Sequence, residues 1–456
     1  MREAARSECA ARIGVVPAGT APPDGIRRLH VVLVNPSKYD DDGYVMRYLR
    51  GVLPSNTLAA LSALTRDVAR RRALGEIEIR LHVLDEHVQR VRPERLLRRR
   101  LARGDRAVVA LCGVQTNQFP RAADLARRFR SAGFAVMIGG FHVSGSVAEG
   151  GGTLPPECRV LADEGVTLVK GEVEACWDDL LRDALHGVLA PFYDVKERPS
   201  LTDAPVPEVD LHLMRKFAYP RMGTIDAGRG CPYRCSFCTI IAVQGRTMRH
   251  RPGSLIRDRI RANAASKIDY YFFTDDNFAR NPGWEEILDA ILGLRRDEGI
   301  AVEFMMQVDA LAHRIPRFAE KAAAAGCSQV FIGMETLNPA NLAAAGKTQN
   351  HAEDYRSMID AWHEHGIACH AGYIIGFPFD TPESVREDVR RLRDEINVDQ
   401  ASFFMLMPLP GSEDHADLVR RGAWMESDYN LFDSFHPTTR HPRMTATEWF
   451  ASFREA

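Results

Sequence analysis

The sequence predicts an α/β protein made of two parallel-sheet domains in tandem. In residues 29–190, short apolar runs alternate with segments of helical periodicity, and the same alternation restarts after a proline-rich stretch. Such alternation is typical of right-handed strand–helix–strand units whose strands lie parallel in one sheet. A loop with three cysteines stands at the head of the second series. We therefore expect ligands to bind at the carboxyl ends of the strands.

The composition is that of an ordinary globular protein. The 456 residues are 45% hydrophobic and 26% charged, with a formal net charge of −2. This length allows two to three domains, and the small net charge gives no signal for nucleic-acid or membrane-surface binding. No apolar run approaches the roughly 20 residues that a membrane span needs, and the N-terminus lacks the apolar core of a secretory signal. The six cysteines outside the loop are scattered singly, so we expect a cytoplasmic protein.

The first domain is expected over residues 29–190, after a loosely attached tail of residues 1–28. Its first strand, 29–36, is a continuous apolar run that ends in Asn-Pro, as is typical of a strand buried on both faces. Further strands are expected at 77–84, 107–113, 135–138 and 168–172, and helices at 93–103, 121–133 and 175–186. This order predicts a doubly wound parallel sheet.

The segments that follow these strands are rich in glycine and neutral polar residues, at 35–37, 113–117, 139–145 and 171–172. Glycine lets the backbone approach a ligand closely, and serine, threonine and asparagine supply neutral hydrogen bonds. We expect a ligand at this edge of the sheet. Residues 85–87, Asp-Glu-His, follow the second strand, and we interpret them as a solvated loop.

The second domain is expected over residues 223–412, after a linker of residues 191–222 whose five prolines argue against regular helix or central strand. Strands are expected at 224–228, 270–274, 302–308, 330–335, 370–376 and 401–407, with helices at 255–266, 284–298, 316–325, 352–365 and 382–395. Six strands with five intervening helices fit an open (β/α)6 barrel. Residues 413–456 form a C-terminal extension with a helix at 446–455, and we expect it to end early or to cover the barrel mouth.

The cysteine loop has the spacing Cys-x3-Cys-x2-Cys, with thiols at Cys231, Cys235 and Cys238. A structural zinc site would need a fourth cysteine or histidine nearby, which the sequence does not offer. An iron–sulfur cluster held by only three thiolates leaves one iron with an open coordination position, where a small molecule can bind. The alternatives are a zinc site with a distant fourth ligand and three unconnected thiols.

This loop, with Phe237 just before the third cysteine, resembles the cluster loop of the radical SAM enzymes. The resemblance implies that Cys231, Cys235 and Cys238 bind a [4Fe–4S] cluster whose open iron chelates S-adenosyl-L-methionine, and that reductive cleavage gives a 5′-deoxyadenosyl radical. The family's usual Gly-Gly-Glu segment is replaced here by Asp-Asp-Asn. By position in the family's pattern, the S-adenosylmethionine contacts are Phe237, Asp275, Asp276, Asn277, Gln307, Glu335, Gly372 and Gly376.

The N-terminal half resembles the Rossmann-like cobalamin-binding domain that precedes the barrel in one large branch of that family. The most specific points are Gly-Gly-x-His and Gly-Glu. The resemblance implies cobalamin contacts at Thr116, Asn117, Gly139, Gly140, Phe141, His142, Gly171 and Glu172. The Asp-x-His-x-x-Gly pattern of proteins that bind cobalt through histidine is not present after the first strand, so the lower axial ligand stays open.

Together the two resemblances imply a cobalamin-dependent radical SAM enzyme that methylates an unactivated carbon in a small natural product or lipid-like substrate. It would need an electron donor such as a flavodoxin or ferredoxin, and no nucleic acid. A radical cyclase or rearrangement enzyme without methyl transfer is the close alternative. A tRNA methylthiotransferase would need three more cluster cysteines in the first domain. A non-catalytic cobalamin or Fe–S binding sensor is the alternative of another class.

Overall fold

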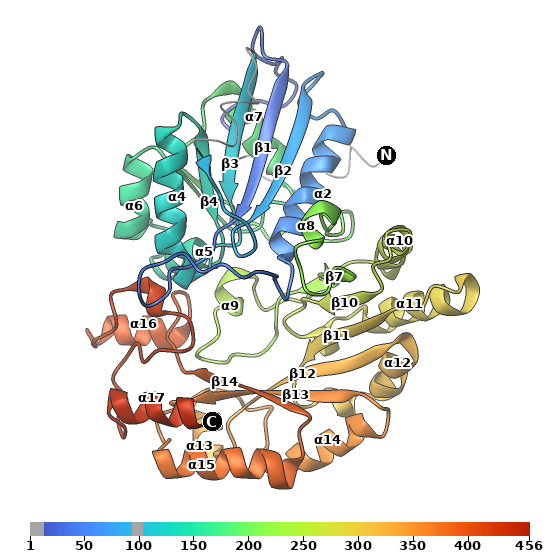
Figure 1. Ribbon diagram of the computed structural model, residues 1–456, viewed down its shortest axis with the longest axis vertical. Helices are drawn as coiled ribbons and strands as arrows, with labels where there is room; N and C mark the ends of the chain where they lie inside the picture. Colours follow the sequence, from blue (N-terminus) through green and yellow to red (C-terminus); the bar gives the residue numbers. More distant parts are fainter. Residues whose placement is uncertain (1–12, 94–103) are drawn as a thin grey trace. The chain divides into compact units, whose positions relative to one another are not determined.

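The computed structural model describes residues 13–93 and 104–456, and the chain divides into two compact units, Met1–Pro220 and Arg221–Ala456. Each unit contains one six-stranded parallel sheet with helices packed on it (Figure 1). The expected tail lies outside the described residues up to residue 12, and the helix expected at 93–103 lies outside them beyond Pro93. Residues 13–27 are held against the first unit, because the backbone N–H groups of Val15 and Val16 both donate to Asp183 at 2.7 Å.

The sheet of the first unit has the strand order β2-β1-β3-β4-β5-β6, and all its neighbours are parallel. The strands are β1 (Arg28–Asn35), β2 (Glu78–Asp85), β3 (Asp105–Leu111), β4 (Ala135–Gly139), β5 (Thr167–Lys170) and β6 (Phe192–Asp194). The chain order reverses at β1, which pairs with β2 on one side and β3 on the other. Ligands of doubly wound sheets bind outside the carboxyl ends at such a point.

Helices cover both faces of this sheet, which confirms the doubly wound arrangement (Figure 1). They are α2 (Asn56–Arg70), α4 (Phe119–Ser131), α5 (Phe141–Glu149), α6 (Pro156–Asp163) and α7 (Trp177–His186). Helices α2 and α7 pack together, and the indole of Trp177 donates to Thr65 at 3.0 Å. The sequence analysis did not anticipate α2, α5 or α6.

The proline-rich stretch of residues 191–222 belongs to the first unit up to Pro220, and it is more ordered than expected. It contributes the edge strand β6 and a four-residue helix, α8 (Leu211–Met214). The expectation of no regular helix is therefore wrong for α8. The physical reason is that all five prolines of the stretch lie outside β6 and α8, where a missing N–H removes no ladder or helix hydrogen bond.

The sheet of the second unit has the order β14-β13-β12-β11-β10-β7, so each strand lies beside the next one in the barrel series. The strands are β7 (Met222–Ile225), β10 (Tyr270–Phe273), β11 (Glu303–Val308), β12 (Cys327–Glu335), β13 (Ala368–Ile375) and β14 (Gln400–Met405). Among the described residues, β7 and β14 do not pair with each other. The expected open six-strand barrel is confirmed.

Helices follow the strands along the outer side of this sheet (Figure 1). They are α10 (Gly253–Ala264), α11 (Trp284–Glu298), α12 (Phe318–Ala325), α14 (Tyr355–His363) and α15 (Pro382–Arg391). Shorter elements were not expected from the sequence: β8 (Gly228–Arg229), β9 (Arg249–His250), α9 (Ile240–Val243), α13 (Pro339–Ala344) and α16 (Glu413–Arg420). None of the helices within residues 13–93 and 104–456 is long and apolar enough to cross a membrane.

The C-terminal helix α17 (Ala446–Glu455) packs against α15 and against strands β13 and β14. Its Trp449 is 1% exposed and donates from the indole nitrogen to the carbonyl of Ile375 at 2.9 Å. Gly376, which follows β13, has φ +112°, and a Cβ there would lie 2.2 Å from the indole. The helix is thus part of the second unit's core.

Candidate functional site

The cysteine loop, which follows the carboxyl end of β7, is flanked by two strands of two residues each. Strands β8 and β9 pair antiparallel, which joins Arg229 to Arg249 across the base of the loop. Gly230 has φ +99°, and a Cβ there would meet the Thr247 carbonyl at 2.7 Å, so only glycine fits this turn. The N–H of Cys231 donates to the carbonyl of Gly245 at 3.1 Å. The loop therefore leaves and returns to the barrel at one fixed point.

The three loop cysteines differ from the other described cysteines in their exposure. Cys231, Cys235 and Cys238 are half-buried, whereas the five others that the structure describes are buried. Burial raises the pKa of all three thiols, that of Cys238 to about 12. Three thiolates at such a site need a bound cation to stabilise them. The donor set therefore fits a thiophilic metal centre that takes three protein ligands.

A second segment, residues 345–350, packs on the cysteine loop. It follows β12 and the short helix α13 in the chain. The N–H of Ser236 donates to the carbonyl of Ala345 at 3.0 Å, and the side-chain amide of Gln349 lies 3.9 Å from the sulfur of Cys235. The sequence analysis missed this segment. The available signal was a run of polar residues, Lys-Thr-Gln-Asn, directly after Gly346.

Two acidic residues, Asp275 and Asp276, lie just after β10. Asp275 is fully buried and accepts hydrogen bonds from the backbone of Ala227 at 2.7 Å and from Asn281 at 3.3 Å. Burial raises its pKa well above the ordinary range. Asp275 thus joins the carboxyl ends of β7 and β10. Asp276 is half-buried beside it.

Asn277, the next residue, is buried and has an unused hydrogen-bond acceptor. Its amide nitrogen donates to Asp309 at 3.0 Å, and Asp309 is also held by two hydrogen bonds from Arg280. The Asn277 side-chain oxygen has no hydrogen-bond partner within the described part of the chain. A buried acceptor of this kind favours a ligand that carries N–H or O–H donors. Gln307, on β11, donates to the backbone carbonyl of Asp275 at 3.1 Å.

The remaining predicted contacts lie at the ends of β12 and β13. Glu335 has φ +67° and forms a buried ion pair with Lys347. A Cβ on Gly372 would lie 2.7 Å from the Phe331 ring, so this glycine gives the ring space. Gly376 gives space to Trp449, as described above. Phe237 packs edge-on against Phe377, with ring centroids 5.9 Å apart.

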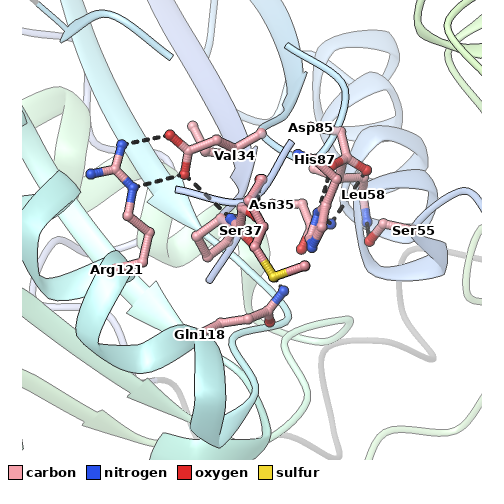
Figure 2. Close-up of polar contacts among 12 residues, drawn as sticks. Val34, Asn35, Ser37, Ser55, Leu58, Asp85, His87, Gln118 and Arg121 are labelled. Carbon is pink, nitrogen blue, oxygen red and sulfur yellow. Dashed lines mark hydrogen bonds and ion pairs between the residues drawn. The ribbon is translucent and has the colours of Figure 1, made fainter. Parts of the chain in front are cut away.

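In the first unit, polar side chains gather where β1 and β2 end (Figure 2). Asp85 and Glu86 are 2% and 0% exposed, so the interpretation of residues 85–87 as a solvated loop is wrong. Glu86 receives hydrogen bonds from Arg121 of α4 at 2.6 and 3.0 Å, and another from the N–H of Ser37 at 3.3 Å. The carboxylate is buried because α4 supplies a guanidinium.

His87 lies at the same edge with one ring nitrogen directed by Asp85. The distance from Nδ1 to the Asp85 carboxylate is 2.9 Å, and the Asn35 amide is 3.3 Å from the same carboxylate (Figure 2). A proton on Nδ1 makes this contact a hydrogen bond. The Asn35 amide nitrogen also lies 3.4 Å from Nδ1, so Asp85 and Asn35 together fix the orientation of the half-buried ring.

The predicted cobalamin contacts cluster at the carboxyl ends of β3, β4 and β5. Gly140 has φ +150°, and a Cβ there would lie 2.1 Å from the backbone nitrogen of Val114. Gly171 has φ +94° and donates its N–H to Ser144 at 3.1 Å. Thr116 is buried in the turn after β3. Asn117, Gly139, Phe141 and Glu172 are half-buried.

His142 is turned away from this edge. Its side chain is fully buried, and its ring packs on Phe119 with a centroid distance of 4.1 Å. Its Nε2 lies 3.7 Å from the Glu157 carboxylate, and Cys158 lies beside both. The structure therefore places His142 in the packing between α4, α5 and α6.

Comparison with known proteins gives one family match. The model of the radical SAM superfamily matches residues 225–392, which cover the last residue of β7, the cysteine loop and strands β10–β13. The bacteriochlorophyllide d C-12(1)-methyltransferase of Chlorobaculum tepidum is 29% identical over 327 residues, which are 68% of this chain and 65% of that protein. The bacteriochlorophyllide d C-8(2)-methyltransferase of the same organism is 25% identical over 355 residues, 75% of this chain and 74% of that protein. The chain thus spans about two thirds to three quarters of these relatives.

Solved structures with both units in one chain are similar as well. The radical S-adenosylmethionine methyltransferase TsrM from Kitasatospora setae, solved with cobalamin and a [4Fe–4S] cluster, has a TM-score of 0.64 at 19% identity and covers 88% of this chain and 79% of its own. The cobalamin-dependent S-adenosylmethionine radical enzyme OxsB has a TM-score of 0.65 at 16% identity, over 95% of this chain and 66% of its own. At these identities the likeness is one of fold.

Proposed function

We propose that this chain is a member of the cobalamin-binding branch of the radical SAM superfamily and that it transfers a methyl group to an unactivated carbon of a small molecule. The observation that carries the proposal is the placement of Cys231, Cys235 and Cys238 at the head of an open six-strand barrel, in a chain whose N-terminal unit is a doubly wound domain. The relatives named above are methyltransferases that act on bacteriochlorophyllides. We propose a substrate of that general kind, a small natural product or lipid-like molecule.

The residues present fit a [4Fe–4S] cluster with S-adenosylmethionine. Cys231, Cys235 and Cys238 would hold the cluster, because burial leaves their thiolates in need of a cation. The side-chain oxygen of Asn277 offers an acceptor for the ammonium of S-adenosylmethionine, and the half-buried Asp276 precedes it in the chain. When bound, the cluster supplies one electron to S-adenosylmethionine, and cobalamin carries the methyl group that is transferred.

We place the cobalamin site in the first unit. Gly140 and Gly171 let the turns after β4 and β5 pack closely on Val114 and Val195, and Thr116 and Asn117 would supply neutral hydrogen bonds at the end of β3. At the ends of β1 and β2, the buried pair of Glu86 and Arg121 fixes the turn that follows β1. These residues would bind and orient the cofactor and keep water out. The domain limits of 29–190 and 223–412 remain part of the proposal.

The proposal also requires a reductant, and a flavodoxin or ferredoxin fits this need. We propose a cytoplasmic location, because the singly scattered cysteines agree with a reducing compartment. No contact with nucleic acid is proposed, because the net charge of −2 gives no electrostatic attraction to phosphates.

The test uses protein that is purified anaerobically, reconstituted with iron, sulfide and cobalamin, and given reductant and S-adenosylmethionine. We expect absorption bands of both cofactors and the formation of S-adenosylhomocysteine as cobalamin is methylated, a step that needs no substrate. With substrate, 5′-deoxyadenosine and S-adenosylhomocysteine should both accumulate. Formation of 5′-deoxyadenosine without S-adenosylhomocysteine would instead support the radical cyclase, and the absence of any S-adenosylmethionine cleavage would support the sensor.

A further inference from the structure

We propose that Lys347 is a positioning residue that sets the reduction potential of the cluster bound by Cys231, Cys235 and Cys238. The inference rests on the proposed function, because it requires the cluster. It concerns a buried cation that Glu335 holds beside the cysteine loop. The family pattern used above assigns no role to this lysine.

The backbone around Lys347 is fixed to the cysteine loop. Gly346 has φ +63°, and a Cβ there would lie 2.8 Å from the carbonyl of Arg234, so the two segments are in direct contact. The hydrogen bond from the N–H of Ser236 to Ala345 lies next to this contact. The position of Lys347 is therefore coupled to that of Cys235.

The side chain of Lys347 is confined as well. The residue is 8% exposed, its ammonium is ion-paired with Glu335, and it lies 5.9 Å from the centre of the Phe237 ring. Glu335 is also 8% exposed. A buried ion pair is a weak source of stability, because desolvation of both charges offsets their attraction. The stability of the fold therefore does not by itself explain this ion pair.

The neighbouring cluster cysteines explain why a cation is placed here. The Lys347 ammonium interacts electrostatically with Cys235 and Cys238 as well as with Glu335. The pair is neutral as a whole, but its positive end lies over the ring of Phe237, the residue before Cys238.

A second donor from the same segment supports this arrangement. The amide of Gln349 lies 3.9 Å from the sulfur of Cys235. Adding an electron makes a thiolate-bound cluster more negative, so a nearby cation stabilises the reduced state more than the oxidised one. Hydrogen bonds to cluster sulfurs and net charge are the features that set Fe–S potentials. Lys347 would therefore make the cluster easier to reduce.

The experiment is a redox titration of the reconstituted full-length protein, followed by EPR without S-adenosylmethionine. In K347M, we expect the ratio of reduced to oxidised cluster at a fixed potential to fall about tenfold, which is ~59 mV for a one-electron couple. In E335Q the ammonium is unopposed, so the ratio should rise. The double variant E335Q/K347M removes both charges and should fall below the wild type.

The matched control is K321M. Lys321 of α12 pairs with Glu285 and Asp289, both at 2.8 Å, and has no contact with the cysteine loop among the described residues. This variant should keep the wild-type potential. A wild-type potential in K347M with full iron content would overturn the inference. Loss of the cluster from both K347M and E335Q/K347M would also overturn it, because Lys347 would then serve cluster assembly.

Failure of the proposed function is distinguishable from failure of this inference. If the wild-type protein takes up no four-iron cluster, the proposed function fails at its first step. If the wild type is loaded and cleaves S-adenosylmethionine while the potentials of the variants do not separate, only the role of Lys347 fails.

Discussion

Arg121 holds the carboxylate of Glu86 through hydrogen bonds of 2.6 and 3.0 Å, and both side chains are buried. The pair joins α4 to the turn after β2, at the edge of the sheet where we place cobalamin. Glu86 also accepts from the N–H of Ser37, in the turn after β1. One guanidinium thus fixes two of the turns that end at this edge.

Replacing Arg121 by methionine should destabilise the first unit by about 3–5 kcal/mol, because it leaves a buried carboxylate unpaired. The measurement is the shift in the thermal unfolding transition of the first unit, followed by calorimetry. R127M is the matched control: Arg127 lies on the same helix and pairs with Glu164, but both are exposed, so its cost should be about 0–1 kcal/mol. The double variant E86Q/R121M should recover part of the loss. Equal effects of R121M and R127M would contradict this interpretation.

Gly376 and Trp449 supply a second prediction. G376A should cost about 2–4 kcal/mol, because the new Cβ would meet the indole at 2.2 Å and the backbone has φ +112°. G366A is the control, since Gly366 has φ +71° but nothing within 4 Å of its Cβ position. It should cost about 1–2 kcal/mol from backbone strain alone. The readout is the shift in thermal unfolding of the second unit.

The contact itself is tested by a double-mutant cycle. If the clash with the indole causes the loss, G376A should cost less in a W449L background than in the wild type. Additive costs would show that backbone strain accounts for the whole effect.

The elements that the sequence predicted well are those determined by local pattern. The apolar run of β1 was expected one residue from its observed ends, and the expected limits of α11 and α17 match those observed. Such runs reveal themselves because each strand or helix buries a face of fixed period. Helix α2 was missed although Ser55 caps it and its leucines and all its alanines except Ala69 are buried.

The parts of the site that the sequence did not reveal depend on pairs far apart in the chain. Glu86 looked like part of a solvated loop because its partner Arg121 is 35 residues away on another element. Gln349 reaches Cys235 across 114 residues. In the sequence, a loop residue that contacts solvent looks the same as one that contacts a buried counter-charge. Only the folded structure distinguishes them.

The assignment of the cluster to the loop cysteines gives a third prediction. Single substitutions C231A, C235A and C238A should each reduce the iron and sulfide content of reconstituted protein severely and abolish S-adenosylmethionine cleavage, because three ligands are the minimum for the site. C369A is the control: Cys369 is buried in β13 and burial raises its thiol pKa to about 12, so it should leave the iron content unchanged. Full iron content in C235A would exclude the proposed ligand set.

Asp380 gives a prediction about pH. This buried carboxyl group accepts hydrogen bonds from the backbones of Gly376 and Phe377 and from Asn341. Burial outweighs these donors and raises its pKa from 3.8 to about 6. Between these two values the folded protein keeps a proton that the unfolded chain has released. The stabilisation from this group is therefore fully present below pH 4 and is lost as the pH rises through 6.

The variant D380N removes this titration, so its stability relative to the wild type should change with pH. Two pKa units correspond to about 3 kcal/mol, and D380N should gain up to that amount relative to the wild type between pH 4 and pH 7. The measurement is the difference in melting temperature of the second unit at each pH. In D163N, which alters an exposed aspartate on α6, the offset from the wild type should stay nearly constant. A constant offset for D380N as well would mean that Asp380 is ionised in the folded protein throughout this range, with its three hydrogen bonds outweighing its burial.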